Sequence, residues 1–571
     1  MTASPVGNGV FIAGEVDNSA SRHSLETNTP SGNLYPVTSS LDSKSEEEKE
    51  SENEEKELNE SGSPESHGRP LGEVGTNCPV ARTRSQNGYG CDDIEAVEVT
   101  PEDDPFIVGW DGGDADPLSP RSRSNFQKWT IVLINSVAAG SVTCVSSIYT
   151  ATYEQILPEF HTSRIVATVG LSLFIFGLGC GPMLLAPLSE FYGRRPIYLV
   201  SFAFFIIWLI PSAVAQNMAT ILVSRFLDGF SGSAFLSVAG GSVYDLYSRD
   251  DLQAPMMVFT ASPFIGPVLG PLLGGFINQY THWRWTYYVL LIWNFVLWVL
   301  IFLFVPETYH PVLLRNKARK IRADTGDERY KAPMELSTKT IPHEIRISLY
   351  RPFQLLALEF MVLNLCVFSG FLLGILYLFF GAFPLVFRNN HGFTLSQIGL
   401  TFLGLLVGML IALATDPLWY KNYRRLIKQN ENDGGAEPEH RLPPAIAGSV
   451  LVPIGIFMFG WTTYSSVHWI VPIIGSTIFA IGNLLVFTGI FTFLVDAYPQ
   501  YAASSLAANS FVRSSFAAVF PLFGVQMYNK LGYQWATSVL AFLTVVMMPF
   551  PYLFFKYGKQ IREKSRFAKS K

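Results

Sequence analysis

Two opposite charges, Arg225 and Asp228, lie three residues apart in an otherwise apolar stretch. On a helix this spacing places both side chains on one face. A charge at membrane depth costs several kcal/mol unless it is paired or faces water, so such residues mark ion or proton pathways. We therefore predict that Asp228 carries or senses a proton and that Arg225 sets its pKa by proximity. A purely structural ion pair between the two residues is the alternative.

Three further charged residues lie in or beside apolar segments of the second half. Glu359 is expected one to two turns inside the seventh segment, where it would face a central cavity together with Arg225 and Asp228 as a substrate or proton site. Arg513 could neutralise an anionic substrate or pair with Asp496, and a packing role is the favoured interpretation. Asp496 and Arg513 are therefore predicted to support the site.

A third pattern combines glycine and proline at four-residue steps. In water, prolines so spaced would break a helix, because each removes a backbone hydrogen bond and clashes with the preceding turn. In a bilayer, neighbouring helices can satisfy the freed groups, and the small residues share one stripe that lets another helix approach. The pattern predicts a kinked, closely packed transmembrane helix that acts as a moving joint. Its residues are Ser262, Gly266, Pro267, Gly270, Pro271, Gly274 and Gly275.

The composition places most of the chain in lipid. The 571 residues are 49% hydrophobic and only 15% charged, against about 25% charged in soluble proteins. From residue 128 onward, apolar segments of about 20 residues recur, the length that crosses the hydrocarbon core. We predict an all-α membrane protein with twelve transmembrane helices in two pseudo-symmetric six-helix bundles. The expected spans are 128–150, 165–188, 197–215, 219–243, 254–278, 284–305, 355–384, 395–416, 444–464, 468–494, 502–525 and 534–555.

The remaining segments define the domain organisation. Residues 1–125 are rich in Ser, Glu, Asn, Gly and Pro and are expected to form a disordered acidic cytosolic tail. The N-terminal bundle is expected over 126–305, a cytosolic linker loop over 306–353, the C-terminal bundle over 354–556 and a basic cytosolic tail over 557–571. No apolar run precedes residue 128, so the first membrane helix is expected to act as the targeting signal.

The distribution of Lys and Arg predicts the orientation in the membrane. These residues gather in the linker loop, in the loop after the eighth span and in the C-terminal tail. Because cytosolic loops carry the excess of positive charge, both termini are expected in the cytosol. We expect a multi-pass protein of the cell membrane, with the vacuolar membrane as the alternative.

Several motifs resemble those of a known family. Ala186 to Pro196 resembles the loop between helices two and three of the major facilitator superfamily, specifically its fungal drug:proton antiporters with twelve spans. Arg225 to Gly232 is similar to the fourth-helix motif of that family, and Gly266 to Gly275 is similar to its fifth-helix antiporter motif. The resemblance implies a secondary active efflux pump, a proton antiporter that exports small amphipathic molecules such as toxins, secondary metabolites or antifungal drugs.

The loop motif makes physical sense as a cytosolic latch at the membrane edge. There a salt bridge can form or break as the two bundles rock, and Asp245 is expected to be the partner of Arg194. Topogenic arginines alone are the alternative. The second half repeats the loop with Tyr420 and Tyr423 in place of the acidic residue and the glycine, so a second latch is not expected. The predicted latch residues are Glu190, Gly193, Arg194, Arg195 and Asp245.

Other function classes lack their signatures. The sequence has no GxxxxGK[ST] loop to hold ATP and no Cys/His cluster, so we predict no enzyme, no cofactor and no metal site. The expected partners are a small-molecule substrate, protons and the lipid bilayer, without nucleic acid, and the protein is expected to be a monomer. A polyamine:proton antiporter is one alternative, which the balance of intramembrane charges disfavours. A non-transporting membrane sensor that signals through its long tail is the alternative of another class.

Overall fold

The structure of this chain is a computed structural model that describes residues 105–111, 113–248, 251–336, 340–429 and 437–568. All of these residues belong to one compact unit, residues 73–571. Their regular secondary structure is helical, and twelve of the helical stretches are long and apolar enough to cross a membrane. The prediction of twelve transmembrane helices is confirmed.

Six of the twelve stretches lie before residue 305, and breaks divide some of them into several helices. The first, second and fourth stretches are composite: α2 (Asn125–Ile148) with η3 (Tyr149–Thr152) and α3 (Tyr153–Glu159), α4 (Arg164–Cys180) with α5 (Pro182–Tyr192), and α7 (Met218–Gly232) with α8 (Ala234–Ser237) and α9 (Ala239–Leu246). The third, fifth and sixth are single helices: α6 (Arg194–Ala213), α10 (Gln253–Tyr280) and α11 (Arg284–Phe304).

The other six stretches follow residue 359. They are α15 (Phe360–His391), α16 (Leu395–Thr401) with α17 (Leu403–Ala414) and α18 (Asp416–Gln429), α19 (Pro443–Trp461), α20 (Ile470–Ala497), η6 (Pro499–Tyr501) with α21 (Ala502–Leu531), and α22 (Tyr533–Met547) with α23 (Pro549–Lys564). Further helices lie outside these stretches. They are η1 (Gly113–Ala115) and η2 (Pro120–Ser122) before the first group, α12 (His310–Thr325), α13 (Pro333–Leu336) and α14 (Ile341–Leu358) between the groups, and η5 (Pro438–Arg441) between α18 and α19.

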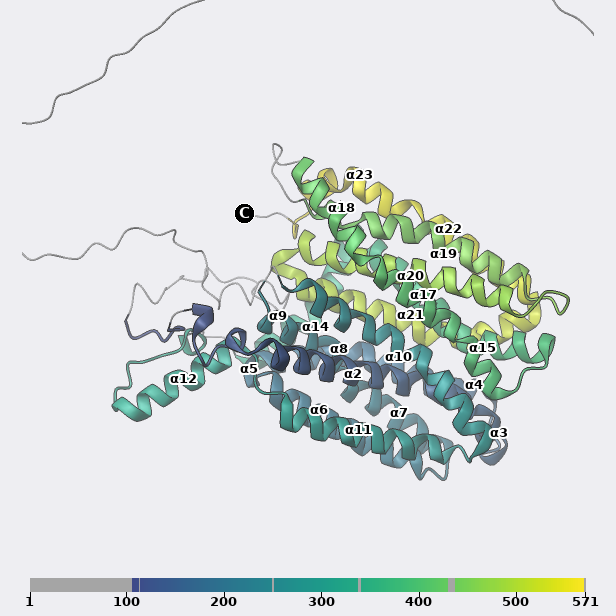
Figure 1. The fold of residues 1–571 in the computed structure, drawn as a ribbon, viewed down its shortest axis with the longest axis horizontal. Helices are drawn as coiled ribbons and strands as arrows, with labels where there is room; N and C mark the ends of the chain where they lie inside the picture. Colours follow the sequence, from purple (N-terminus) through teal and green to yellow (C-terminus); the bar gives the residue numbers. More distant parts are fainter. Residues whose placement is uncertain (1–104, 112, 249–250, 337–339, 430–436, 569–571) are drawn as a thin grey trace, which may run out of the picture. The chain divides into compact units, whose positions relative to one another are not determined.

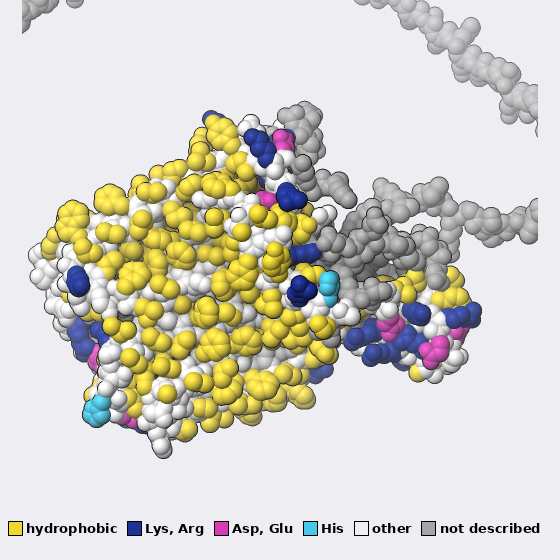
Figure 2. Space-filling view, turned by 180° about the vertical axis from the view of Figure 1, so that it is seen from behind, with side chains coloured by type: hydrophobic (Ala, Val, Ile, Leu, Met, Phe, Trp, Pro, Cys, Tyr) yellow, Lys and Arg dark blue, Asp and Glu magenta, His cyan; other side chains and the backbone are white. Residues whose placement is uncertain are grey.

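The long helices run side by side in two bundles, purple to teal for the first six stretches and green to yellow for the last six (Figure 1). Helix α12 projects at one end of the bundles, and α3 lies at the opposite end (Figure 1). We call these the α12 end and the α3 end. The surface between the ends is broadly apolar, and Lys and Arg side chains gather at the α12 end (Figure 2). This is the surface that a bilayer-spanning protein presents to lipid.

The glycine stripe of α10 packs against α2. The helix continues through Pro263, Pro267 and Pro271 without a break. A Cβ built on Gly270 would lie 2.6 Å from the backbone nitrogen of Ile148, and one built on Gly274 would lie 2.8 Å from the Cβ of Ala151. Because glycine has no Cβ, the two backbones can approach to this extent. The close helix approach expected from the stripe is present, and its partner is the first span.

Residues 105–111 and 113–122 depart from the expected disorder of the acidic tail, because they are ordered against the linker. Val108 donates its backbone N–H to the carbonyl of Lys331 at 2.9 Å. The Lys317 ammonium lies 2.8 Å from the carboxylate of Asp116. Backbone pairing and a largely buried ion pair therefore fix this part of the chain, which composition alone does not reveal. Residues 1–104 of the expected tail lie outside the described residues.

Candidate transport site

A cavity of about 480 Å³ lies between the two bundles. It is lined by Tyr244 and Asp496 at the α12 end and by Phe264 and Arg513 farther in. Arg513 follows the start of α21 by eleven residues, which corresponds to about 16 Å along the helix axis and about half the thickness of the hydrocarbon core. The cavity therefore extends from the α12 end to mid-depth.

Beyond this depth the two bundles touch each other. The Ser146 hydroxyl on α2 lies 2.9 Å from the Tyr377 hydroxyl on α15. Closer to the α3 end, Ser396 donates its backbone N–H to the side chain of Gln279 at 2.7 Å, and Arg388 pairs with Glu154 at 3.1 Å between Nη2 and Oε2. These contacts join the bundles on the α3 side, so the cavity faces the α12 end in this conformation.

Arg225 and Asp228 are fully buried in α7, but they do not form the ion pair offered as the structural alternative. The Arg225 guanidinium instead donates to the carbonyls of Val145 and Ser146 on α2, at 2.9 and 2.8 Å. Its Cζ also lies 4.7 Å from the centre of the Tyr149 ring. Both backbone acceptors lie in the last turn of α2, just before the chain continues as the 3-10 helix η3. Arg225 thus fastens α7 to α2.

Asp228 lies beside this cluster with neither carboxylate oxygen hydrogen-bonded among the described residues. The Tyr287 hydroxyl on α11 is also buried without a hydrogen-bond partner there. Neither Arg225 nor Asp228 lines the cavity between the bundles, so their predicted place in the central cavity is wrong. Helix α7 packs mainly against α4 and α6 and also contacts α2, and this packing encloses both residues inside the first bundle. An unpaired buried carboxylate still marks a site at which protonation and conformation can be linked.

Glu359 is also placed differently from the prediction. It is the N-cap residue of α15, because the seventh span begins at Phe360 and not at residue 355. Its carboxylate accepts hydrogen bonds from the Tyr498 hydroxyl at 3.1 Å and from the Ser565 hydroxyl at 2.6 Å. The residue does not line the cavity. Glu359 therefore holds the C-terminal segment at the α12 end, and its prediction as a cavity residue is wrong.

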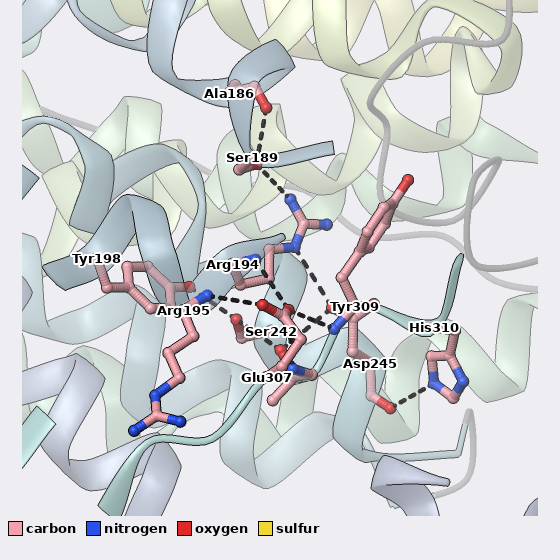
Figure 3. Close-up of polar contacts among 11 residues, drawn as sticks. Ala186, Ser189, Arg194, Arg195, Tyr198, Ser242, Asp245, Glu307, Tyr309 and His310 are labelled. Atoms are coloured by element: carbon pink, nitrogen blue, oxygen red, sulfur yellow. Dashed lines mark hydrogen bonds and ion pairs between the residues drawn. The ribbon is translucent and has the colours of Figure 1, made fainter. Parts of the chain in front are cut away.

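The expected ion pair of the loop motif is present at the α12 end. Arg194 Nε lies 3.4 Å from Asp245 Oδ2, and both side chains are fully buried (Figure 3). Arg194 also donates to the Ser189 hydroxyl at 2.8 Å. Gly193, just before Arg194, has a φ of 102°, a value that glycine adopts without steric cost. The turn between α5 and α6 thereby directs Arg194 toward α9.

Glu307 is the member of this cluster that the motif analysis missed. Its carboxylate accepts the backbone N–H groups of Arg194 and Arg195 at 2.9 and 3.1 Å, which are the first two residues of α6 (Figure 3). A carboxylate at this position satisfies orphan donors and interacts favourably with the helix dipole. Burial raises the pKa of Glu307, and its backbone hydrogen bonds offset part of that effect. The sequence feature that could have pointed to Glu307 is the segment Pro306-Glu307-Thr308-Tyr309, in which an acidic residue directly follows the sixth span.

The second half uses a different arginine at the corresponding place. Asp496, at the end of α20, lies 2.7 Å from the Nε of Arg441. The Arg441 guanidinium also stacks over the Tyr423 ring, with Cζ 3.7 Å from the ring centre. The alternative pairing of Asp496 with Arg513 is therefore absent. Arg441 comes from η5, outside the repeated loop, and so the repeat did not point to it.

The fold agrees with comparisons to known proteins. The family profile described as Major Facilitator Superfamily matches residues 133–521. The chain belongs to this superfamily.

Curated relatives of this major facilitator protein cover most of its length. It is 54% identical over 470 residues to "Efflux pump atB" of Aspergillus terreus, which covers 82% of this chain and 90% of the relative. It is 42% identical over 457 residues to "Probable drug/proton antiporter YHK8" of Saccharomyces cerevisiae, with 80% and 88% covered. Among solved structures, a partially occluded inward-open form of the xylose transporter XylE from E. coli shares the fold, with a TM-score of 0.53, 15% identity, and 76% and 98% covered.

We predict that the Arg194→Ala change slows transport by this major facilitator protein without reversing its orientation. The substitution removes the guanidinium that pairs with the buried Asp245 carboxylate, and breaking a buried ion pair by removing one partner costs about 3–5 kcal/mol. Transport at equal surface abundance is expected to fall by more than about tenfold. Arg195→Ala is the matched control, because it removes the same charge one residue away and leaves the ion pair of Arg194 with Asp245 in place. If the two variants transport at the same rate as the unmodified protein, Arg194 has only a topogenic role.

Proposed function

We propose that this chain is a proton antiporter that exports small amphipathic organic molecules from the cytosol. The observation that carries the proposal is the cavity between the two bundles, which faces the α12 end while the bundles meet on the α3 side. Lys and Arg gather at the α12 end (Figure 2), which is the pattern of a cytosolic surface. The relatives named "Efflux pump atB" and "Probable drug/proton antiporter YHK8" support transport out of the cytosol.

The lining of the cavity supports an amphipathic cargo. Most of the lining residues are apolar, and polar side chains are interspersed among them: the lining includes Met256, Met257, Phe259, Phe264, Phe491, Thr488 and Asn509. Pockets of this composition bind molecules by apolar contact and orient them with a small number of hydrogen bonds. Methionine side chains also adapt to different shapes. A set of related cargo molecules is therefore expected.

The proposed proton site is Asp228. It lies in the first bundle away from the cavity, so binding of the proton and binding of the cargo must be linked through the helices. A chain of contacts offers the link: Arg225 holds the carbonyl of Ser146 at 2.8 Å, and the hydroxyl of Ser146 contacts Tyr377 of the second bundle at 2.9 Å. A change of charge at Asp228 would alter how Arg225 holds α2. That in turn would alter the contact between the bundles.

The oligomeric state, the membrane and the orientation form part of the same proposal. We place it as a monomer in the cell membrane, with both termini in the cytosol and the vacuolar membrane as the alternative. In this orientation Arg194 and Asp245 form the cytosolic latch, and α10 is the joint along which the bundles rock.

The energy source provides the direct test. In inside-out membrane vesicles, accumulation of an amphipathic fluorescent dye is expected to require an inward-acid proton gradient. It should collapse when a protonophore is added, whether or not ATP is present, because the driving force is the gradient, worth about 2.3 kcal/mol per charge per 100 mV. Accumulation that needs ATP and persists without the gradient would contradict the proposal.

A further inference from the structure

The deepest charged side chain in the cavity lining is a cation without a counter-ion. Arg513 lines the cavity from α21. Among the described residues its Nε is buried without a hydrogen-bond partner, and no carboxylate lies within ion-pair distance of its guanidinium. The acidic lining residues Glu190, Glu344, Asp416 and Asp496 lie near the ends of α5, α14, α18 and α20, at the α12 rim of the cavity.

Aromatic rings surround this cation from two bundles. The Cζ of Arg513 lies 5.9 Å from the ring centre of Phe264 on α10, 5.7 Å from Phe487 and 5.3 Å from Phe491 on α20. The faces of such rings attract a guanidinium, but they do not supply the hydrogen-bond acceptors that it normally has. Arg513 therefore combines a buried Nε donor that has no partner among the described residues with an aromatic, apolar surrounding.

The same face of α21 presents a polar atom one turn earlier. Asn509 lines the cavity and donates its Nδ2 to the Ser369 hydroxyl at 2.7 Å. Its Oδ1 is buried without a hydrogen-bond partner in the described part of the chain. Residues four apart lie next to each other on a helix. The guanidinium of Arg513, a hydrogen-bond donor, and the Oδ1 of Asn509, a hydrogen-bond acceptor, thus lie next to each other on α21.

We propose that Arg513 binds the carboxylate of the transported molecule, so that the cargo class is amphipathic organic anions with an aromatic or other flat apolar body. The inference rests on the proposed export function and names its substrate class. The guanidinium fork matches a carboxylate with two parallel hydrogen bonds. The rings of Phe264 and Phe491, which line the cavity, pack on the apolar body. A polycation would meet a like charge at this depth, which disfavours the polyamine alternative.

The test compares two probes of the same shape. The purified full-length protein in detergent, without a proton gradient, is titrated with 2-naphthoate and with 2-naphthamide at neutral pH, and binding is followed by thermal stabilisation. We expect the unmodified protein to bind the carboxylate at least about tenfold more tightly, as for hydrogen bonds between charged groups. Equal binding of the two probes would overturn the proposal without any variant.

Variants then assign the preference to Arg513. Arg513→Gln is expected to bind both probes with equal affinity, and its binding of 2-naphthamide reports that the cavity is intact. Arg513→Lys keeps the charge and should retain part of the preference. Arg441→Gln is the matched control, because it removes a cavity-lining arginine that already pairs with Asp496. A carboxylate preference that survives in Arg513→Gln would overturn the proposal.

The experiments distinguish failure of the anion site from failure of the export function. Gradient-driven accumulation of 2-naphthamide with no preference for 2-naphthoate would leave proton-driven export standing and remove the anion site. A clear binding preference without gradient-driven transport of either probe would keep the anion site and remove the exporter.

Discussion

Replacing Asp228 by asparagine is expected to abolish uphill export while energy-independent exchange of cargo across the membrane continues. The side chain keeps its size and its hydrogen-bonding capacity but can no longer change its charge. Both carboxylate oxygens are buried without hydrogen-bond partners among the described residues, and taking an unpaired charge out of water costs several kcal/mol. A site of this kind couples proton uptake to helix packing, and asparagine removes the coupling but not the packing.

The measurement is accumulation against a concentration gradient in proteoliposomes, beside counterflow in the same vesicles, at equal amounts of protein. Glu359→Gln is the matched control. It removes a buried carboxylate at the α12 end, where Tyr498 and Ser565 contact it, and should leave uphill export in place. Normal gradient-driven export with an unchanged pH dependence in Asp228→Asn would show that the proton is carried elsewhere.

The second large effect is expected from Gly270→Ala in α10. In an isolated helix the change would stabilise by about 1 kcal/mol, since alanine is the better helix former. Here the added Cβ would lie 2.6 Å from the nitrogen of Ile148 and 2.9 Å from the carbonyl of Cys144. Backbone atoms cannot move aside as a flexible side chain can, so overpacking at the upper end of about 1–3 kcal/mol outweighs the gain. We expect a lower melting temperature and a severe loss of transport.

A substitution on the lipid-facing side of the same helix provides the comparison. Leu273 is 40% exposed on the protein surface, and Leu273→Val changes its volume without entering the interface with α2. Melting temperature and transport should stay near those of the unmodified protein. If Gly270→Ala behaves in the same way as Leu273→Val, then neither stability nor transport depends on the close approach of α2 and α10.

Features that depend on one segment at a time were predictable from the sequence. A run of about 20 apolar residues needs no knowledge of the rest of the chain to indicate a span, and all twelve spans are present. The stripe of Gly266, Gly270 and Gly274 likewise predicts a close helix approach from helical periodicity alone. The ion pair of Arg194 with Asp245 could be predicted from the sequence, because the two motifs that contain these residues end at the same side of the membrane.

The tertiary structure decided the partners of the buried charges. Asp228 is the nearest opposite charge to Arg225 along α7, but the guanidinium reaches carbonyls of α2 that lie about 80 positions earlier in the chain. Glu307 caps α6 from more than 100 positions away. Glu359 was expected in the cavity but lies at the N-terminal end of α15, where its carboxylate accepts a hydrogen bond from Tyr498 at the α12 end. Spacing along one helix determines which side chains share a face, but a long cation at that face takes whichever acceptor the neighbouring helix brings closest.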